Sequence, residues 1–142
     1  AQQRINGADW PDAGITPYEA GESAAALAER GCDFIDVSSG GNVLANVPLG
    51  PGYQVPLAEV VRKRSGLPTI AVGLINEPHQ AEAIVAEGRA DMVAIARAAL
   101  NNPHWPWQAA EALDATVEVP LQYFRAATRA GVPPPYHVET RA

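Results

Sequence analysis

Short apolar runs alternate with longer stretches of helical periodicity along most of the chain. The short runs are compact and rich in β-branched residues, and Gly, Asn or Pro bounds them, which is typical of buried parallel strands. Strands are predicted to end near Asn6 and to lie within 34–37, 67–72 and 91–96. Helices are predicted over 16–30, 56–64, 76–88 and 102–112. Four strand–helix units in a row predict a parallel α/β sheet.

Local signals set the limits of these helices. The segment 16–19 (TPYE) combines an N-cap, a proline at the first helical position and a capping-box glutamate. Gly31 and Gly66 follow two of the predicted helices, where a left-handed stop is expected. Asn102 is expected to cap the last helix, ahead of Pro103.

The alternation stops after residue 115. The triplet 133–135 (PPP) cannot continue a helix, so this part of the chain is expected to lie on a surface or to reach a neighbour. We therefore divide the chain into residues 1–115, which carry the sheet, and a C-terminal tail, residues 116–142.

Composition and charge exclude several kinds of partner. Ten basic residues stand against sixteen acidic ones, for a net charge of −6, and nucleic-acid binding needs clustered positive charge. No apolar run approaches the roughly 18 to 20 residues that span a bilayer, and no signal-peptide pattern opens the chain. With Cys32 as the sole cysteine, no disulfide framework can form within the chain. We expect no nucleic-acid or membrane partner and a reducing, cytoplasmic setting.

A metal site is not expected either. His79, His104 and His137 lie far apart in the sequence, and a single cysteine cannot build a thiolate site. Each histidine is expected to be exposed or to lie near a helix start.

The residues that follow the predicted strands are the candidates for ligand binding, because parallel α/β folds bind ligands at the carboxyl ends of their strands. These positions are Arg4, the loop Ser38-Ser39-Gly40-Gly41, Gly73-Leu74 and Ala96-Arg97. Arginine forks and backbone N–H groups left accessible by glycine both suit a phosphate or another delocalised anion. The last two positions follow successive strands, as do the phosphate loops of barrel enzymes. The pattern alone leaves two interpretations open, a phosphate site or ordinary loops with a surface arginine.

Five segments add a resemblance to a known family. They are 4–10 (RINGADW), 31–41 (GCDFIDVSSGG), 51–56 (PGYQVP), 71–75 (AVGLI) and 90–103 (ADMVAIARAALNNP). In this order and spacing, between about Arg4 and Arg125, they resemble the C-terminal half of the old yellow enzymes. The likeness is greatest to the xenobiotic-reductase-like and thermophilic-type ene-reductases. It implies a (β/α)8 TIM barrel with FMN, of which this chain supplies about strands five to eight, because a whole barrel needs about 250 residues.

The resemblance also assigns roles to the strand-end residues. Arg4 is expected on the pyrimidine side of the flavin, where its charge stabilises the reduced, anionic ring. Ser39 and Gly40 are expected among the cofactor-binding residues. The phosphate cradle is expected to consist of Gly73, Leu74, Ala96 and Arg97, with alanine at a position where the family often has glycine. In the segment 120–125 (PLQYFR), Arg125 matches an arginine that enters the active site of the adjacent protomer, which implies a homo-oligomer.

The implied activity is that of an FMN-dependent NAD(P)H oxidoreductase. Such ene-reductases take a hydride from NADPH or NADH and reduce a C=C bond conjugated to a carbonyl or nitro group. A His/His or His/Asn pair holds the substrate oxygen and a tyrosine supplies the proton. These catalytic residues belong to the first four strands, and nothing in this chain matches them. The chain is therefore expected to need the N-terminal half of the barrel as its partner and to be inactive alone.

Other interpretations remain open from the residues alone. A half-barrel resembling the sugar-phosphate isomerases would use the same last two loops. Such enzymes need acid/base carboxylates at strand ends, where only Asp36 is available, inside a strand. A flavodoxin-like FMN module would need a Ser/Thr-rich loop after its first strand, and the segment 4–8 (RINGA) is not one. The chain could also be a structural remnant without a ligand.

Overall fold

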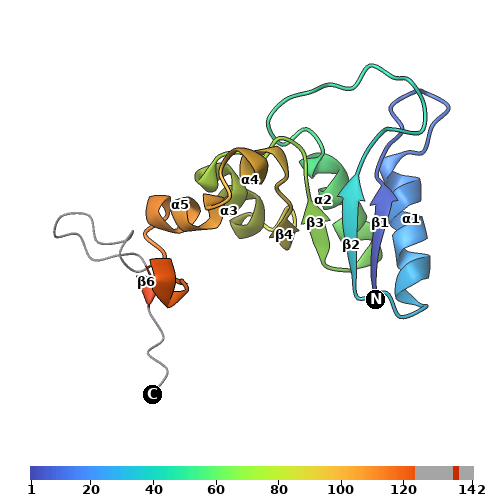
Figure 1. The fold of residues 1–142 in the computed structure, drawn as a ribbon. Helices are drawn as coiled ribbons and strands as arrows, with labels where there is room; N and C mark the ends of the chain where they lie inside the picture. The colour runs from blue at the N-terminus through green and yellow to red at the C-terminus, as the bar shows by residue number, and fades with distance from the viewer. Residues whose placement is uncertain (124–135, 138–142) are drawn as a thin grey trace.

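The computed structural model of the chain describes residues 1–123 and 136–137. Its main sheet is parallel and has the strand order β1-β2-β3-β4. The strands are β1 (Gln2–Asn6), β2 (Phe34–Ser38), β3 (Thr69–Ala71) and β4 (Met92–Val93), and the helices are α1 (Pro17–Ala28), α2 (Val55–Ser65), α3 (Pro78–Ala86), α4 (Arg97–Asn101) and α5 (Trp105–Ala112). Figure 1 shows the strands side by side, with α1 beside β1 and with α3, α4 and α5 beyond β4. The predicted parallel α/β alternation is confirmed.

The strand order bears on one of the alternatives. Strands that follow each other in sequence are neighbours throughout this sheet. A flavodoxin-like sheet has the order 2-1-3-4-5, in which the chain reverses direction across the sheet. The described sheet has no such reversal, so it does not support a flavodoxin-like module.

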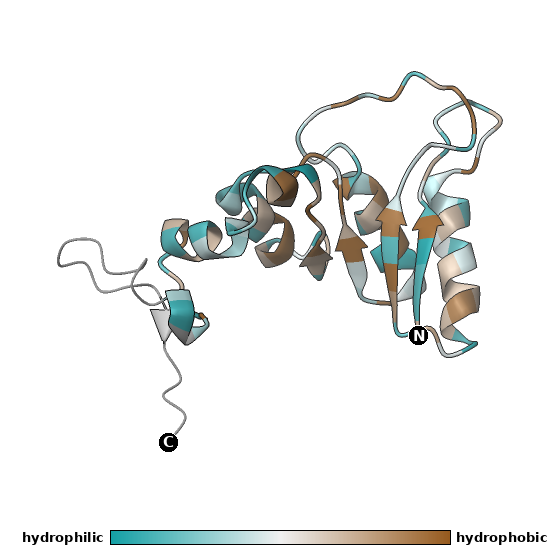
Figure 2. Ribbon diagram, in the orientation of Figure 1, coloured by the Kyte–Doolittle hydropathy of each residue, from teal (hydrophilic) through white to brown (hydrophobic). Residues whose placement is uncertain are grey.

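The two faces of the sheet differ in what covers them. Ile35 and Val37 are fully buried in the core that α1 and α2 form against the sheet. Because side chains alternate along a strand, Asp36 between them lies on the opposite face. The register places Arg4, Asp36, Ile70 and Met92 in one row across the four strands. We call the face that carries this row the open face. Figure 2 shows that β1 is mainly hydrophilic, whereas β3 is mainly hydrophobic.

Small residues let α1 and α2 approach each other and the sheet closely. Ala20 and Ala24 of α1 and Ala58 and Val61 of α2 are fully buried. A Cβ at Gly21 would lie 2.8 Å from the Cβ of Arg64 on α2. Alanine and glycine at the contact between α1 and α2 thus let the two helices approach each other closely.

The predicted stops of the first two helices are confirmed. Thr16 is the N-cap of α1: its hydroxyl accepts from the Glu19 N–H, and the Glu19 carboxylate accepts from the Thr16 N–H, which completes the capping box. Gly31 adopts φ +84° just beyond α1, and Gly66 ends α2 in the left-handed conformation.

The predicted helix over 102–112 is wrong at its start. The chain forms α4 first, and α5 begins only at Trp105, with His104 as its N-cap. Asn102 ends α4 instead of opening α5. Its Oδ1 accepts from the His104 N–H at 3.0 Å and its Nδ2 donates to Gln108 at 2.8 Å, so its side chain bridges the turn between the two helices.

The start of the C-terminal tail lies against α5. The ring of His104 stacks on Trp107 with 4.3 Å between centroids, and Tyr123 meets both rings edge-on. A short parallel pair joins β5 (Val117–Glu118) to β6 (Tyr136–His137). Within the described part of the chain, none of the helices has the length and apolar character needed to cross a membrane.

Candidate functional site at the ends of β3 and β4

A cavity of about 90 Å³ lies where β3 and β4 end. Residues after both strands and residues just before α2 line it: Tyr53, Gln54, Val72, Gly73, Leu74, Ile75, Asn76, Ala94, Ile95, Ala96 and Arg97. A water molecule occupies about 30 Å³ in the liquid, so the cavity has the size of a small anionic group rather than of a whole cofactor.

The backbone at the β3 end is held in an uncommon conformation. Gly73 has φ +122°, and Leu74, which is not a glycine, has φ +54°. A Cβ at Gly73 would lie 3.0 Å from Gln54 Nε2 and 3.1 Å from the Tyr53 ring. Glycine at this position keeps the cavity open, and backbone outliers of this kind cluster at binding sites.

The cavity is bordered by hydrogen-bond donors that have no acceptor in the described part of the chain. Among residues 1–123, the N–H groups of Leu74 and Ala96 have no acceptor, and the Arg97 guanidinium makes no hydrogen bond or ion pair. The Gln54 amide also has a free donor at Nε2. Unused N–H donors on residues that line one cavity, together with an arginine, favour a phosphate or another anion with several acceptor oxygens.

Gln54 is held in place by a relay of polar side chains. It is a buried polar residue, only 5% exposed. The Trp10 indole N–H donates to Ser39 Oγ at 3.0 Å, and this hydroxyl donates to Gln54 Oε1 at 2.6 Å. The relay uses the oxygen of the amide, so the nitrogen is left toward the cavity.

The loops after β1 and β2 are tied together around Asp9. Hydrogen bonds from the Asn6 side chain, from the Ile15 N–H and from the Asn42 side chain hold the pKa of the Asp9 carboxyl below its usual value. Gly40, at φ +73°, donates its N–H to Ala8 at 3.0 Å, and its carbonyl accepts from Asn6 at 3.1 Å. These contacts fix the loop that carries Ser39.

Arg4 lies on the open face, away from the residues that line the cavity. Its Nε and Nη2 both donate to Asp36 Oδ2, at 2.8 and 2.5 Å. The two side chains differ sharply in exposure, with 62% for Arg4 and 6% for Asp36. The other oxygen of Asp36, Oδ1, is buried and has no partner among the described residues.

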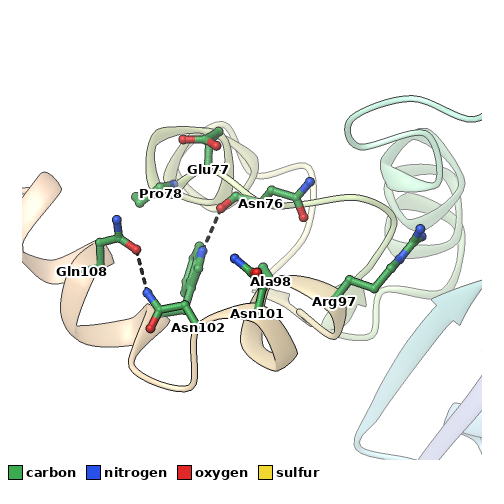
Figure 3. Close-up of a pocket in the computed structure, with 9 residues that line it drawn as sticks. Asn76, Glu77, Pro78, Arg97, Ala98, Asn101, Asn102 and Gln108 are labelled. Carbon is green, nitrogen blue, oxygen red and sulfur yellow. Dashed lines mark hydrogen bonds between the residues drawn. The ribbon is translucent and has the colours of Figure 1, made fainter.

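A second, larger cavity of about 430 Å³ lies between the start of α3 and the α4–α5 turn. In Figure 3, the side chain of Arg97 points away from Asn101 and Asn102, while the Trp105 indole donates to the Asn76 carbonyl at 2.7 Å. Arg97 borders both cavities.

The structure brings four of the predicted site residues together: Gly73, Leu74, Ala96 and Arg97 all line the 90 Å³ cavity. Ser39 bonds to the lining residue Gln54, Gly40 holds the loop that carries Ser39, and Arg4 lies on the open face. Arg125 lies outside the described residues. The roles of all these residues toward a cofactor stay predictions.

Among the lining residues that were not predicted as site residues, Tyr53 and Gln54 come from outside the two strand ends. They belong to the segment 51–56, whose PGYQVP pattern precedes α2 and contributed to the family resemblance. The signal that the sequence offered for this part of the site was a glutamine just before a predicted helix.

Comparison with known proteins identifies a family for the chain. The family model described as the NADH:flavin oxidoreductase / NADH oxidase family matches residues 2–116. The chain belongs to this family. The family fold is a TIM barrel, and the resemblance to the old yellow enzymes is confirmed.

Proteins named NADPH dehydrogenase are among its relatives. Those of Geobacillus thermodenitrificans (strain NG80-2) and Geobacillus sp. (strain WCH70) are 44% and 45% identical over 122 residues, which is 86% of this chain. The one of Halalkalibacterium halodurans is 44% identical over 123 residues, or 87% of the chain. The chain spans only 36% of the length of each of these relatives.

Proposed function

We propose that this chain is the flavin-phosphate-binding half of an FMN-dependent NAD(P)H oxidoreductase and supplies about strands five to eight of its barrel. The observation that carries the proposal is the cavity at the ends of β3 and β4, which is lined from two successive strand ends by residues with unused donors. Membership of the NADH:flavin oxidoreductase / NADH oxidase family supports a flavin as the ligand.

The residues present fit the phosphate of FMN. A phosphate dianion needs several donors and little space, and the cavity offers the N–H groups of Leu74 and Ala96, the Gln54 amide and the Arg97 guanidinium. The missing Cβ at Gly73 leaves room that an alanine would fill. We assign phosphate binding to these groups, with Arg97 as the main source of charge.

The remaining strand-end residues act along the rest of the cofactor. The Arg4 guanidinium binds the pyrimidine side of the ring and stabilises negative charge there. Ser39 and Gly40 act through the loop after β2, which holds Gln54 in place. When bound, FMN accepts a hydride from a nicotinamide and passes it to the substrate.

The proposed reaction is that of an ene-reductase, which reduces alkenes conjugated to a carbonyl or nitro group. Relatives named NADPH dehydrogenase support NADPH as the reductant. The substrate-activating residues are supplied by the N-terminal half of the barrel, which pairs with the open edges and the open face of this sheet. We use "assembled protein" for this chain together with that half.

The test is the affinity of the assembled protein for FMN, measured by flavin fluorescence quenching. Arg97→Ala removes the charged fork, and a charge-assisted hydrogen bond contributes about 1.5 to 3 kcal/mol, so Kd is expected to rise about 10- to 100-fold. Arg30→Ala is the matched control, because within residues 1–123 the Arg30 side chain bonds only to the Ala26 carbonyl at the end of α1.

Either of two results would contradict the proposal. One is an Arg97→Ala variant that binds FMN as tightly as the unchanged protein. The other is an assembled protein that binds inorganic phosphate at this cavity but takes up no flavin, which would favour a sugar-phosphate enzyme instead.

A further inference from the structure

Two arginine–aspartate pairs connect neighbouring elements of this fold, and they are built differently. In the first, Arg62 of α2 donates from Nε and Nη2 to separate oxygens of Asp91, at 2.8 and 2.9 Å. Asp91 also accepts from the Thr69 N–H at 2.8 Å. Both oxygens of this carboxylate are satisfied, as expected of a group that stabilises the fold.

The second pair, Arg4 and Asp36, leaves half of its carboxylate unused. Both donors of Arg4 go to Oδ2, while Oδ1 is buried without a partner among the described residues. All hydrogen bonds of the Asp36 side chain in that part of the chain therefore go to a single arginine. An arrangement that served only stability would be expected to satisfy both oxygens.

Burial shows which member of this pair is fixed. The Asp36 side chain is 6% exposed and lies in the middle of β2, whereas Arg4 is 62% exposed on β1. Asp36 is therefore the buried anchor, and Arg4 is the exposed side chain that it holds. Two of the three guanidinium nitrogens are bound to the anchor, so only Nη1 is left free over the open face.

We propose that Asp36 is a positioning residue that holds the Arg4 guanidinium in the orientation in which it stabilises the reduced flavin. The proposal rests on the function proposed above, because Arg4 needs a bound flavin to act on. It assigns Asp36 no contact with the cofactor and no role in proton transfer.

Positioning predicts a definite sign for the reduction potential of the bound flavin. Asp36→Asn keeps an acceptor but loses the charge-assisted bond, so Arg4 is released and the reduced flavin is less well stabilised. We expect the ratio of reduced to oxidised flavin at a fixed potential to fall about tenfold, which is about 30 mV more negative for a two-electron couple. Removal of a nearby negative charge alone would shift the potential in the opposite, positive direction.

The experiment measures the potential of the FMN-loaded assembled protein by equilibration with a reference dye. Asp91→Asn is the matched control: it makes the same chemical change in the other pair, and the potential is expected to stay unchanged. Arg4→Lys is the second test, because lysine keeps the charge but lacks the planar fork, and the exposed position tolerates the change. This variant is expected to shift the potential in the same direction as Asp36→Asn.

A double-mutant cycle shows whether Asp36 acts through Arg4. In an Arg4→Gln background, Asp36→Asn is expected to produce no further negative shift, and only the positive shift from the loss of the Asp36 charge remains. An additional negative shift in that background, a positive shift in Asp36→Asn alone, or an Arg4→Lys variant with an unchanged potential would each overturn the inference. These failures differ from failure of the proposed function, which would appear as an unchanged assembled protein that binds no FMN.

Discussion

At the scale of single residues, the cavity depends on a glycine at a position where a side chain would fill the cavity. Gly73 combines a positive φ with neighbours at 3.0 and 3.1 Å from a Cβ, whereas Gly88 has φ +69° with open space around it. A substitution at Gly88 therefore strains the backbone alone, whereas a substitution at Gly73 both strains the backbone and fills the cavity. Only Gly73 meets both conditions at the cavity.

Gly73→Ala is expected to raise the Kd for FMN by at least about tenfold and to lower the free energy of unfolding by about 1 to 3 kcal/mol. The added methyl group enters the space between Tyr53 and Gln54. Flavin titration and urea denaturation of the assembled protein measure the two effects. Gly88→Ala, the control, is expected to cost about 1 to 2 kcal/mol of stability without any change in Kd. Equal affinities for FMN in both variants would contradict a phosphate cradle at Gly73.

At the scale of elements, the end of β1 is fixed by its contact with β2 and α2. Gly7 donates its N–H to the Ser38 carbonyl at 2.8 Å, directly after the paired residues Asn6 and Ser38. A Cβ at Gly7 would lie 2.8 Å from Val37 Cγ1 and 2.9 Å from Leu57 Cβ. The close approach of these three elements places the loop after β1 at the carboxyl end of the sheet.

Gly7→Ala is expected to destabilise the assembled protein by about 1 to 3 kcal/mol, because the methyl group overpacks buried side chains that cannot move independently. Gly50→Ala is the matched control: a Cβ there meets nothing within 4 Å, and its effect is expected to stay within about 0.5 kcal/mol. Thermal or urea unfolding measures both variants. A Gly7→Ala protein as stable as the control would mean that α2 does not approach β1 this closely.

The elements also show which parts of the molecule the sequence predicts well. The limits of α1 and α2 depend on Thr16 and Gly66, whose effect is local, and both were predicted. Helix α4 was missed because Ala96–Leu100 continues the apolar run of the preceding strand and carries no cap signal. Its start depends on the turn at Ala96, which tertiary packing sets.

The same distinction holds for the candidate site. The strand-end residues Gly73 and Arg97 follow from where the strands end, so sequence could place them together. Gln54 lines the cavity with its amide oxygen held by Ser39, fifteen positions away in the sequence. The Arg4–Asp36 pair requires the register of β1 against β2, which short strands do not specify by pattern alone.

At the scale of the whole molecule, the proposed function needs surfaces beyond this chain. The chain spans 36% of the length of its relatives, and the residues that activate the substrate are expected in the remainder. The C-terminal tail is proposed to extend the assembly further, because Arg125 matches an arginine that acts in the adjacent protomer.

Arg125→Ala in the assembled protein is expected to raise KM for an activated alkene about tenfold or more, because a charge-assisted contact to the substrate is lost, while the Kd for FMN stays unchanged. Steady-state kinetics with NADPH and flavin titration separate the two effects. Arg129→Ala removes the same side chain from the same segment and serves as the control. Parallel loss of flavin and substrate affinity in Arg125→Ala would contradict a role on the substrate side in trans.

The two outer strands of the sheet have a kinetic consequence. Among residues 1–123 and 136–137, neither β1 nor β4 has a strand beside its outer edge, so each presents backbone groups that can template another chain. Docking of the missing strands competes with that association. If both halves share one polypeptide, docking occurs at an effective concentration in the millimolar range and is expected to win. If the two halves are separate chains, the rate of docking depends on their concentrations. A high yield of the assembled protein then requires that both halves be synthesised in the same cell at the same time.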